Sequence, residues 1–280
     1  MKKTIICILI LAFCLTGSAR ITKKQQQKIS SNNHEHNREN GSTLQKSFNQ
    51  VNLKAESNDG QRYKYYVDSE FDIFDYIDTQ EIDFSGSNFR GCSITGGVFR
   101  SCTFQNVNFR QANFEETVIT NSDLTGCYFD DANCQKVKFT DNNFSKSSFI
   151  ETELRFSDFT NSDLSYTNFK SNLFIDVNLQ SANFSFSKFD SVTFENANLK
   201  NTNFNGATCN KCLFNYNDLS SANFEGANFP LTYFNEVSFK GTNLKNVNFY
   251  HSTFYRCIFD KEVKNKIDFS QSNLDKVEFV

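Results

Sequence analysis

The chain contains 280 residues, of which 22% are charged, and its formal net charge is −3. This weak negative balance disfavours nucleic-acid binding through phosphate contacts, and a hydrophobic content of 38% excludes a protein with several membrane spans. Phe occurs 33 times, whereas Trp is absent and Pro occurs once. The chain therefore has enough large apolar side chains to build a packed core.

The first residues have the layout of a secretory signal peptide. Two lysines precede the apolar run from Ile5 to Phe13, and Gly17 and Ala19 stand as the small residues of a cleavage site. We therefore expect residues 1–19 to be removed and the mature protein to be secreted or to lie in the periplasm or envelope. The alternative is an uncleaved N-terminal helix. The apolar run is too short to cross a bilayer, so no transmembrane span is expected in the mature chain.

Two further segments precede the main part of the chain. Residues 20–60 are rich in Gln, Asn, Ser and Lys without an apolar period, which predicts a disordered polar linker. Residues 61–81 contain many aromatic and acidic residues, and the spacing of Phe71, Phe74 and Ile77 suits a short amphipathic helix, while alternation with acids suits a strand. In either form we expect this segment to cap the first repeat.

Residues 82–280 have a period of five. Of the 40 positions reached in steps of five from Phe84 to Phe279, 27 are Phe, 8 are Leu, 2 are Ile, 2 are Cys and one is Lys264. The residue two places earlier is small, and the residue one place earlier is Asn or Asp in 21 of the 40 cases. An α-helix cannot hold a fixed period of five, so the chain must bend once per repeat around a filled core.

Individual repeats resemble a known unit. Ala112-Asn113-Phe114, Ala182-Asn183-Phe184 and Ala222-Asn223-Phe224 resemble the A-[D/N]-[L/F]-x-x unit of the pentapeptide-repeat family. The resemblance covers residues 82–280 and implies an all-β fold, a right-handed quadrilateral parallel β-helix of about ten coils with four pentapeptides per coil. Residues twenty apart should then stack, and Asn and Asp before the large residues should form polar ladders that bond the backbone at the bends.

The repeat region offers no convincing catalytic, cofactor-binding or metal site. Cys209 and Cys212 form a C-x-x-C, as in redox and zinc sites, but both positions face inward, and small core residues explain them better. His251 is the only His of the repeat region and occupies an outward position. The sequence contains no Gly-rich phosphate loop and no nucleophile motif. We therefore expect a protein that is not an enzyme and needs no cofactor.

Large side chains at outward positions are the candidates for protein contact. Tyr166 and Phe186 are twenty residues apart, so the four-sided coil predicts that they are neighbours, and Arg90 and Arg110 stack in the same way. The last coil exposes strand edges, which we expect to meet a second copy in a homodimer. The residues of that end are Phe269, Leu274 and Phe279.

These features predict an exported, non-catalytic binding or scaffold protein that presents a rigid β-helical surface to a protein partner. The resemblance also implies an alternative, a DNA mimic that binds a type II topoisomerase, as quinolone-resistance members of the family do. Residues 82–280 carry 18 basic and 22 acidic groups, a balance of only −4, and the export signal also argues against that alternative. A secreted effector acting on host membranes or proteins is a further alternative that the sequence does not separate from the first.

Overall fold

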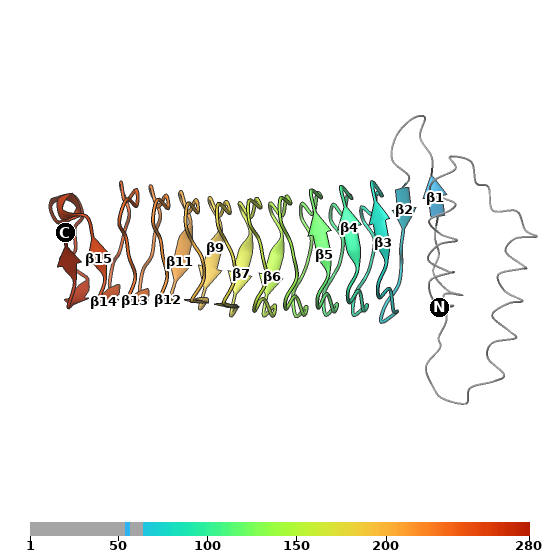
Figure 1. The fold of residues 1–280 in the computed structure, drawn as a ribbon, viewed down its shortest axis with the longest axis horizontal. Coiled ribbons are helices and arrows are strands. Elements are labelled where there is room, and N and C mark those ends of the chain that lie inside the picture. The colour runs from blue at the N-terminus through green and yellow to red at the C-terminus, as the bar shows by residue number, and fades with distance from the viewer. Residues whose placement is uncertain (1–53, 57–63) are drawn as a thin grey trace, which may run out of the picture. The chain divides into compact units, whose positions relative to one another are not determined.

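The computed structural model describes residues 54–56 and 64–280, and the expected signal peptide and nearly all of the expected linker lie outside them (Figure 1). From Val67 onward the chain winds as a parallel β-solenoid of about ten coils, which confirms the predicted fold class. Each coil takes twenty residues, because Phe149 pairs with Phe169 and Phe169 pairs with Phe189. Figure 1 shows these coils stacked side by side along one axis.

Short strands form parallel sheets along the sides of the coil. One sheet contains β3 (Asp78–Gln80), β4 (Val98–Arg100) and β5 (Val118–Thr120). A second contains β6 (Ser148–Ile150), β7 (Asn168–Lys170), β9 (Lys188–Asp190) and β11 (Thr208–Asn210). A third contains β8 (Leu173–Ile175), β10 (Thr193–Glu195), β12 (Leu213–Asn215), β13 (Tyr233–Asn235), β14 (Thr253–Tyr255) and β16 (Asn273–Asp275). β15 (Ile258–Phe259) pairs with β17 (Glu278–Phe279), and single bridges such as Asn183 to Asn203 complete the coils.

The coil bends two residues after each large inward residue. The carbonyl of Phe84 accepts a hydrogen bond from the amide of Ser87 at 3.1 Å, which closes a turn whose third residue, Gly86, has a φ of +75°. Most bends place a residue other than glycine at positive φ, including Phe186 at +59°. This conformation is unfavourable for residues with a Cβ. The hydrogen bonds between coils offset the cost, as when the amide of Phe186 donates to the carbonyl of Asn205 at 2.9 Å. We call these positions corners.

The large inward residues stack from coil to coil and fill the interior. The rings of Phe129 and Phe149 have centroids 4.8 Å apart and an interplanar angle of 4°, and Phe169 and Phe189 continue the same column. Rings on neighbouring sides meet edge to face, as Phe144 and Phe149 do at 64°. Both contact geometries are favourable for aromatic pairs, so burial and ring geometry together stabilise the coil.

The predicted polar ladder is also present. The amide nitrogen of Asn203 donates to Oδ1 of Asn183 at 2.9 Å, and Asn223 donates to Asn203 at 3.1 Å. Each Oδ1 also accepts a hydrogen bond from the backbone two residues later, as Asn183 does from Ser185 at 3.1 Å. The ladder thus links successive coils and closes each bend, because one side chain serves both contacts.

The solenoid register begins earlier than the sequence indicated. Residues 67–81, which the sequence placed in the cap segment 61–81, bridge the next coil through Asp68 to Asn88 and Ile73 to Ser93, and they are not helical. A small inward residue, the buried Ser69, hides this first repeat in the sequence. The described residues before the first coil are β1 (Lys54–Glu56), in the segment expected to be a linker, and β2 (Lys64–Tyr66), which pairs antiparallel with β1.

The register is interrupted once near the C-terminal end of the solenoid. The 3₁₀ helix η1 (Lys261–Asn265) stands where the period of five would place Lys264 as the inward residue. Val263 of this helix is buried there instead of a Phe ring. The register then resumes, since Phe269 stacks on Phe249 and Phe279 stacks on Phe259. The part of the chain that the structure describes contains no helix with the length and apolar character of a membrane span.

Candidate binding surfaces

The outer surface of the coil is the part available for binding, because stacked rings fill the described interior. Within residues 54–56 and 64–280, no three His, Cys, Asp or Glu side chains are grouped in a way that could hold a metal ion. His251 stands at a corner, and its ring lies beside that of Tyr250, with centroids 4.0 Å apart. The side chains that protrude from the coil are therefore the candidates for binding.

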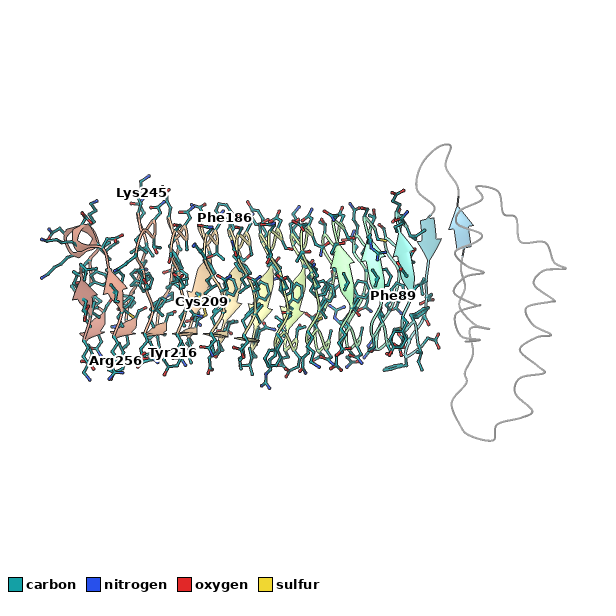
Figure 2. The ribbon with its side chains drawn as sticks, viewed as in Figure 1. Phe89, Phe186, Cys209, Tyr216, Lys245 and Arg256 are labelled. Carbon is teal, nitrogen blue, oxygen red and sulfur yellow. A yellow bond between two sulfur atoms is a disulfide. The ribbon has the colours of Figure 1, made fainter. Side chains whose placement is uncertain are left out.

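Tyr166 and Phe186 are neighbours on the surface. Their ring centroids are 5.2 Å apart, their planes differ by 17°, and the residues are 55% and 48% exposed. The ring of Phe186 reaches over the next corner, where a Cβ on Gly206 would lie only 2.6 Å from its Cε1 atom. Figure 2 shows Phe186 at the outer edge of the coil, on the same edge as Lys245. We call Tyr166, Phe186, Gly206 and Gly226 the aromatic corner.

Polar groups that bond one another surround the aromatic corner. The amide nitrogen of Asn205 donates to the carbonyl of Glu225 at 2.9 Å, and the ammonium of Lys245 lies 2.6 Å from Oε1 of Glu225. The hydrogen bond from Lys245 and its positive charge lower the pKa of the Glu225 carboxyl and, reciprocally, raise the pKa of Lys245. This rim is polar and ionised near neutral pH, as is typical of the border of a contact site.

The structure places Arg90 and Arg110 on the same side in successive coils but in different settings. Nε of Arg110 lies 3.0 Å from Oδ2 of Asp130, and its guanidinium carbon is 4.2 Å from the centroid of the Tyr128 ring. Arg90 is exposed, and its backbone amide bonds the side chain of Asn88. Arg110 is thus held by the next coil, so the two guanidinium groups do not form a joint site.

The three residues of the expected dimer end lie together in the last coil. Leu274 is 39% exposed, whereas Phe269 and Phe279 are half-buried because each stacks on the ring of the preceding coil. The ammonium of Lys264 lies 5.9 Å from the Phe279 ring. The helix η1 therefore covers part of this end.

The structure shows a second group of exposed apolar residues that the sequence analysis missed. Leu231, Tyr233 and Tyr250 are all exposed, and the amide of Leu231 donates to the carbonyl of Tyr250 at 3.0 Å. Tyr166 and Phe186 stand at corners, whereas Tyr233 precedes an inward Phe and Tyr250 follows one. The signal in the sequence is large apolar side chains at the outward positions directly before and after inward Phe residues.

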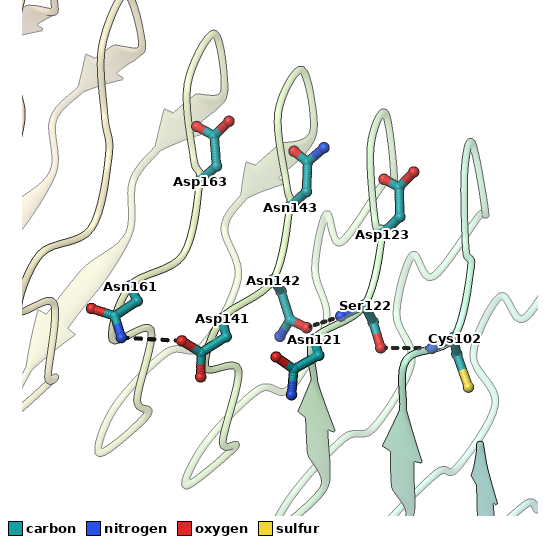
Figure 3. A pocket seen from close by; sticks show the side chains of 9 residues that line it. All are labelled: Cys102, Asn121, Ser122, Asp123, Asp141, Asn142, Asn143, Asn161 and Asp163. Carbon is teal, nitrogen blue, oxygen red and sulfur yellow. Dashed lines mark hydrogen bonds between the residues drawn. The ribbon is translucent and has the colours of Figure 1, made fainter. Parts of the chain in front are cut away.

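A shallow depression of the described surface is polar (Figure 3). It has a volume of about 470 Å³ and is lined by Cys102, Asn121, Ser122, Asp123, Asp141, Asn142, Asn143, Asn161 and Asp163. The amide of Asn161 donates to Asp141 at 3.1 Å, Asn142 accepts from the amide of Ser122 at 2.8 Å, and Ser122 accepts from the amide of Cys102 at 3.0 Å. These hydrogen bonds join successive coils, so the polar groups that line the depression serve to hold the coils together.

The cysteines of the described coils lie inside them. Cys209 and Cys212 are buried, as their inward positions predict, but their sulfurs are joined in a disulfide that the sequence analysis did not assign. Burial raises the pKa of the Cys257 thiol to about 11 and raises that of Cys127 and Cys134 further. These thiols remain protonated near neutral pH and are poor nucleophiles.

Comparison with known proteins agrees with this architecture. The model of a pentapeptide repeat region matches residues 92–169, and the model of pentapeptide repeats in eight copies matches residues 152–196, 194–229 and 232–260. No curated protein has a sequence that matches this chain significantly.

Two solved structures are among those similar to this chain. HetL, a pentapeptide repeat protein involved in heterocyst differentiation regulation in the cyanobacterium Nostoc sp. strain PCC 7120, is 15% identical, with a TM-score of 0.53 over 69% of this chain and 91% of HetL. QnrB1, a plasmid-mediated fluoroquinolone resistance protein, is 16% identical, with a TM-score of 0.43 over 72% of this chain and 93% of QnrB1. The matched repeats and the twenty-residue coils together show that this chain belongs to the pentapeptide-repeat family.

Proposed function

We propose that this protein is an exported, non-catalytic binding or scaffold protein that presents a rigid β-helical surface to a protein partner. The observation that carries the proposal is the stacked and exposed pair Tyr166 and Phe186. Aromatic residues on a rigid support, surrounded by polar groups, are frequent anchors of protein interfaces. The filled interior supports binding rather than catalysis, because a substrate would find no enclosed site there.

The surface charge supports a protein partner over mimicry of DNA. The ladder beside the aromatic corner consists of Asp163, Asn183, Asn203, Asn223 and Asn243, so neutral amides outnumber carboxylates. A surface that imitates a duplex needs a dense row of negative charge.

The partner surface is tested by comparing variants of the full chain as bait in extracts of its source. Tyr166→Asn and Phe186→Asn remove the rings, and Asn accepts the positive φ of both corners. Phe156→Asn is the matched control, because Phe156 is also an exposed corner ring but belongs to another edge. We expect a partner retained by the wild type and by Phe156→Asn to be lost with the other two variants. Equal retention by all four proteins would refute the proposed surface.

Export is proposed from the signal-peptide layout of residues 1–19. Cell fractionation with the intact mass of the native protein provides the test. A chain that begins at Arg20 and is found outside the cytosol is the expected result, whereas a full-length chain in the cytosol would contradict export.

We also propose that the last coil contacts a second copy of the chain. The exposed Leu274 and the outer edges of β16 and β17 support this contact, since unpaired strand edges favour association. Analytical ultracentrifugation at micromolar concentration should show a dimer that Leu274→Glu dissociates. A monomeric wild type at that concentration would contradict the proposal.

A further inference from the structure

Three aromatic rings at the corners of this solenoid lean over a glycine one coil further along. A Cβ added to Gly91 would lie 2.4 Å from the Phe71 ring, and one added to Gly96 would lie 2.8 Å from the Tyr76 ring. The pair Phe186 and Gly206 repeats this arrangement at 2.6 Å. The three pairs belong to three different edges of the coil, so the arrangement follows from corner geometry. A glycine at a corner therefore leaves room for a ring from outside its own coil.

One corner glycine beside the aromatic corner is left open. Gly226 follows Gly206 by one coil, and a Cβ added to Gly226 would meet no atom within 4 Å. Gly206 has no side chain to lean over Gly226, and the ring of Phe186 stops over Gly206. The result is a slot with the outer face of the Phe186 ring on one side and the backbone of Gly226 as its floor.

The interval between successive corners suits a stack of flat rings. Successive coils are about 4.8 Å apart, as strands in a sheet are. Tyr166 and Phe186 stack with their centroids 5.2 Å apart. A third ring placed over Gly226 would continue this stack at the same interval and would bury the exposed face of Phe186. An aromatic group gains more here than an aliphatic one, because it can stack on the ring face.

The rim of the slot favours a group carried by a protein. Glu225 is paired with Lys245, and Asn228 accepts a hydrogen bond from Asn248 at 2.8 Å, so these polar groups are satisfied before a partner arrives. An apolar ring entering between them displaces water from the Phe186 ring and leaves the ion pair intact. The small and mixed charge of this rim offers no attraction for the phosphates of a nucleic acid.

We propose that the protein partner inserts one aromatic side chain into the slot over Gly226, as the third ring of the stack begun by Tyr166 and Phe186. This inference rests on the proposed function, since it names the group with which the partner contacts the aromatic corner. The slot accepts one ring, because beyond Gly226 the next corner on this edge is Asn246, which has a side chain.

The direct test titrates the full chain with N-acetyltryptophanamide and observes backbone amides by NMR. The chain has no Trp, so fluorescence excited at the red edge of indole absorption comes from the probe alone and gives a second measure of its binding. N-acetyltryptophanamide should shift the amide signals of Gly206 and Gly226, with a dissociation constant in the millimolar range. N-acetylleucinamide should leave both signals in place. Equal shifts with both probes, or no shift with either, would overturn the slot. A stronger response to adenosine would overturn a protein partner.

Variants at one corner sharpen the test. Gly226→Asn and Gly226→Tyr each place a Cβ in the open space over the Gly226 backbone, which is the floor of the slot; we expect both to weaken binding of the probe about fivefold or more. Asn106 and Asn246 occupy corners of the same edge at φ +57°, so the fold accepts Asn there. Gly86→Asn is the matched control at an open glycine of that edge and should leave the response of Gly206 unchanged. A probe response that survives both Gly226 variants would refute the proposal.

The partner found with the bait experiment separates this inference from the proposed function. Loss of that partner with both Phe186→Asn and Gly226→Asn supports both. Loss with Phe186→Asn alone overturns the inserted ring while the contact surface stands. Binding that neither substitution changes overturns the surface itself.

Discussion

Asparagines in the small inward slots differ in how well their hydrogen bonds are satisfied. Asn142 accepts from the amide of Ser122 at 2.8 Å and donates to the carbonyl of Ile119 at 2.7 Å, whereas Oδ1 of the buried Asn217 has no partner among the described residues. Ala fills the slot of Asn217 one coil earlier, at Ala197. We expect Asn217→Ala to raise the free energy of unfolding by about 1 kcal/mol and Asn142→Ala to lower it by about 1–3 kcal/mol. Urea unfolding measures both, and equal losses would contradict the distinction.

The contact between Phe186 and Gly206 can be measured as the loss in free energy of unfolding when a methyl group is added to Gly206. Gly206→Ala places a Cβ in the space of the Phe186 ring, while Gly226→Ala meets open space, and both corners have a similar positive φ. We expect Gly206→Ala to be the more destabilising by about 1–2 kcal/mol, the cost of overpacking. In a Phe186→Gly background, which leaves no side chain over residue 206, the two substitutions should cost the same. Thermal melts of the four proteins give this cycle, and a difference that persists without the ring would contradict it.

The helix η1 acts as a local cover for the last coil. Val263 is 8% exposed, and Lys261, the first residue of η1, is tied to the residue after β17, since its amide donates to the carbonyl of Val280 at 2.8 Å. Val263→Ser should therefore loosen this end by about 1–2 kcal/mol, the cost of losing a buried apolar side chain. Hydrogen exchange should accelerate at the amide of Val280, which donates to Phe259, and stay unchanged at Phe129. Faster exchange throughout the coils would contradict a local role.

The whole solenoid is defined by one interval, so its length should change only in suitable steps. Deleting residues 131–150 removes one coil and returns every later residue to the column it occupied before, because all ladder pairs lie twenty apart. Deleting residues 131–148 moves inward rings into corner positions. We expect the first variant to fold cooperatively with a strand spectrum by circular dichroism and the second to lose it. Similar melts for both deletions would contradict a fixed register.

Much of this architecture could be predicted because the decisive residues repeat. The columns of Phe from Phe84 to Phe279 specify the coil, and the polar ladder follows from the Asn before each ring. The first coil escaped the sequence analysis because the small Ser69 occupies an inward slot there. Lys264 showed where the register breaks, but the 3₁₀ form of η1 depends on Val263 turning inward.

Less of the candidate site could be predicted. The spacing of twenty placed Tyr166 beside Phe186, but it did not show that the Phe186 ring occupies the space over Gly206 and leaves the space over Gly226 open. The open slot at Gly226 is therefore a property of three corners taken together. The Cys209–Cys212 disulfide escaped for a related reason, since two inward slots on neighbouring sides bring their sulfurs together at the bend.

Ladder bonds that join only adjacent coils also determine how the solenoid would respond to force. Tension applied between the two ends of the described coils loads these ladders in series, so the weakest end coil should peel away first and the others should follow one at a time. Each event frees twenty residues, a contour length of about 66–72 Å. A partner that contacts the whole aromatic corner would hold together the coils that contain residues 166 to 226. These coils would then not unfold one at a time, and the force–extension record of a molecule with bound partner would lack the corresponding twenty-residue steps.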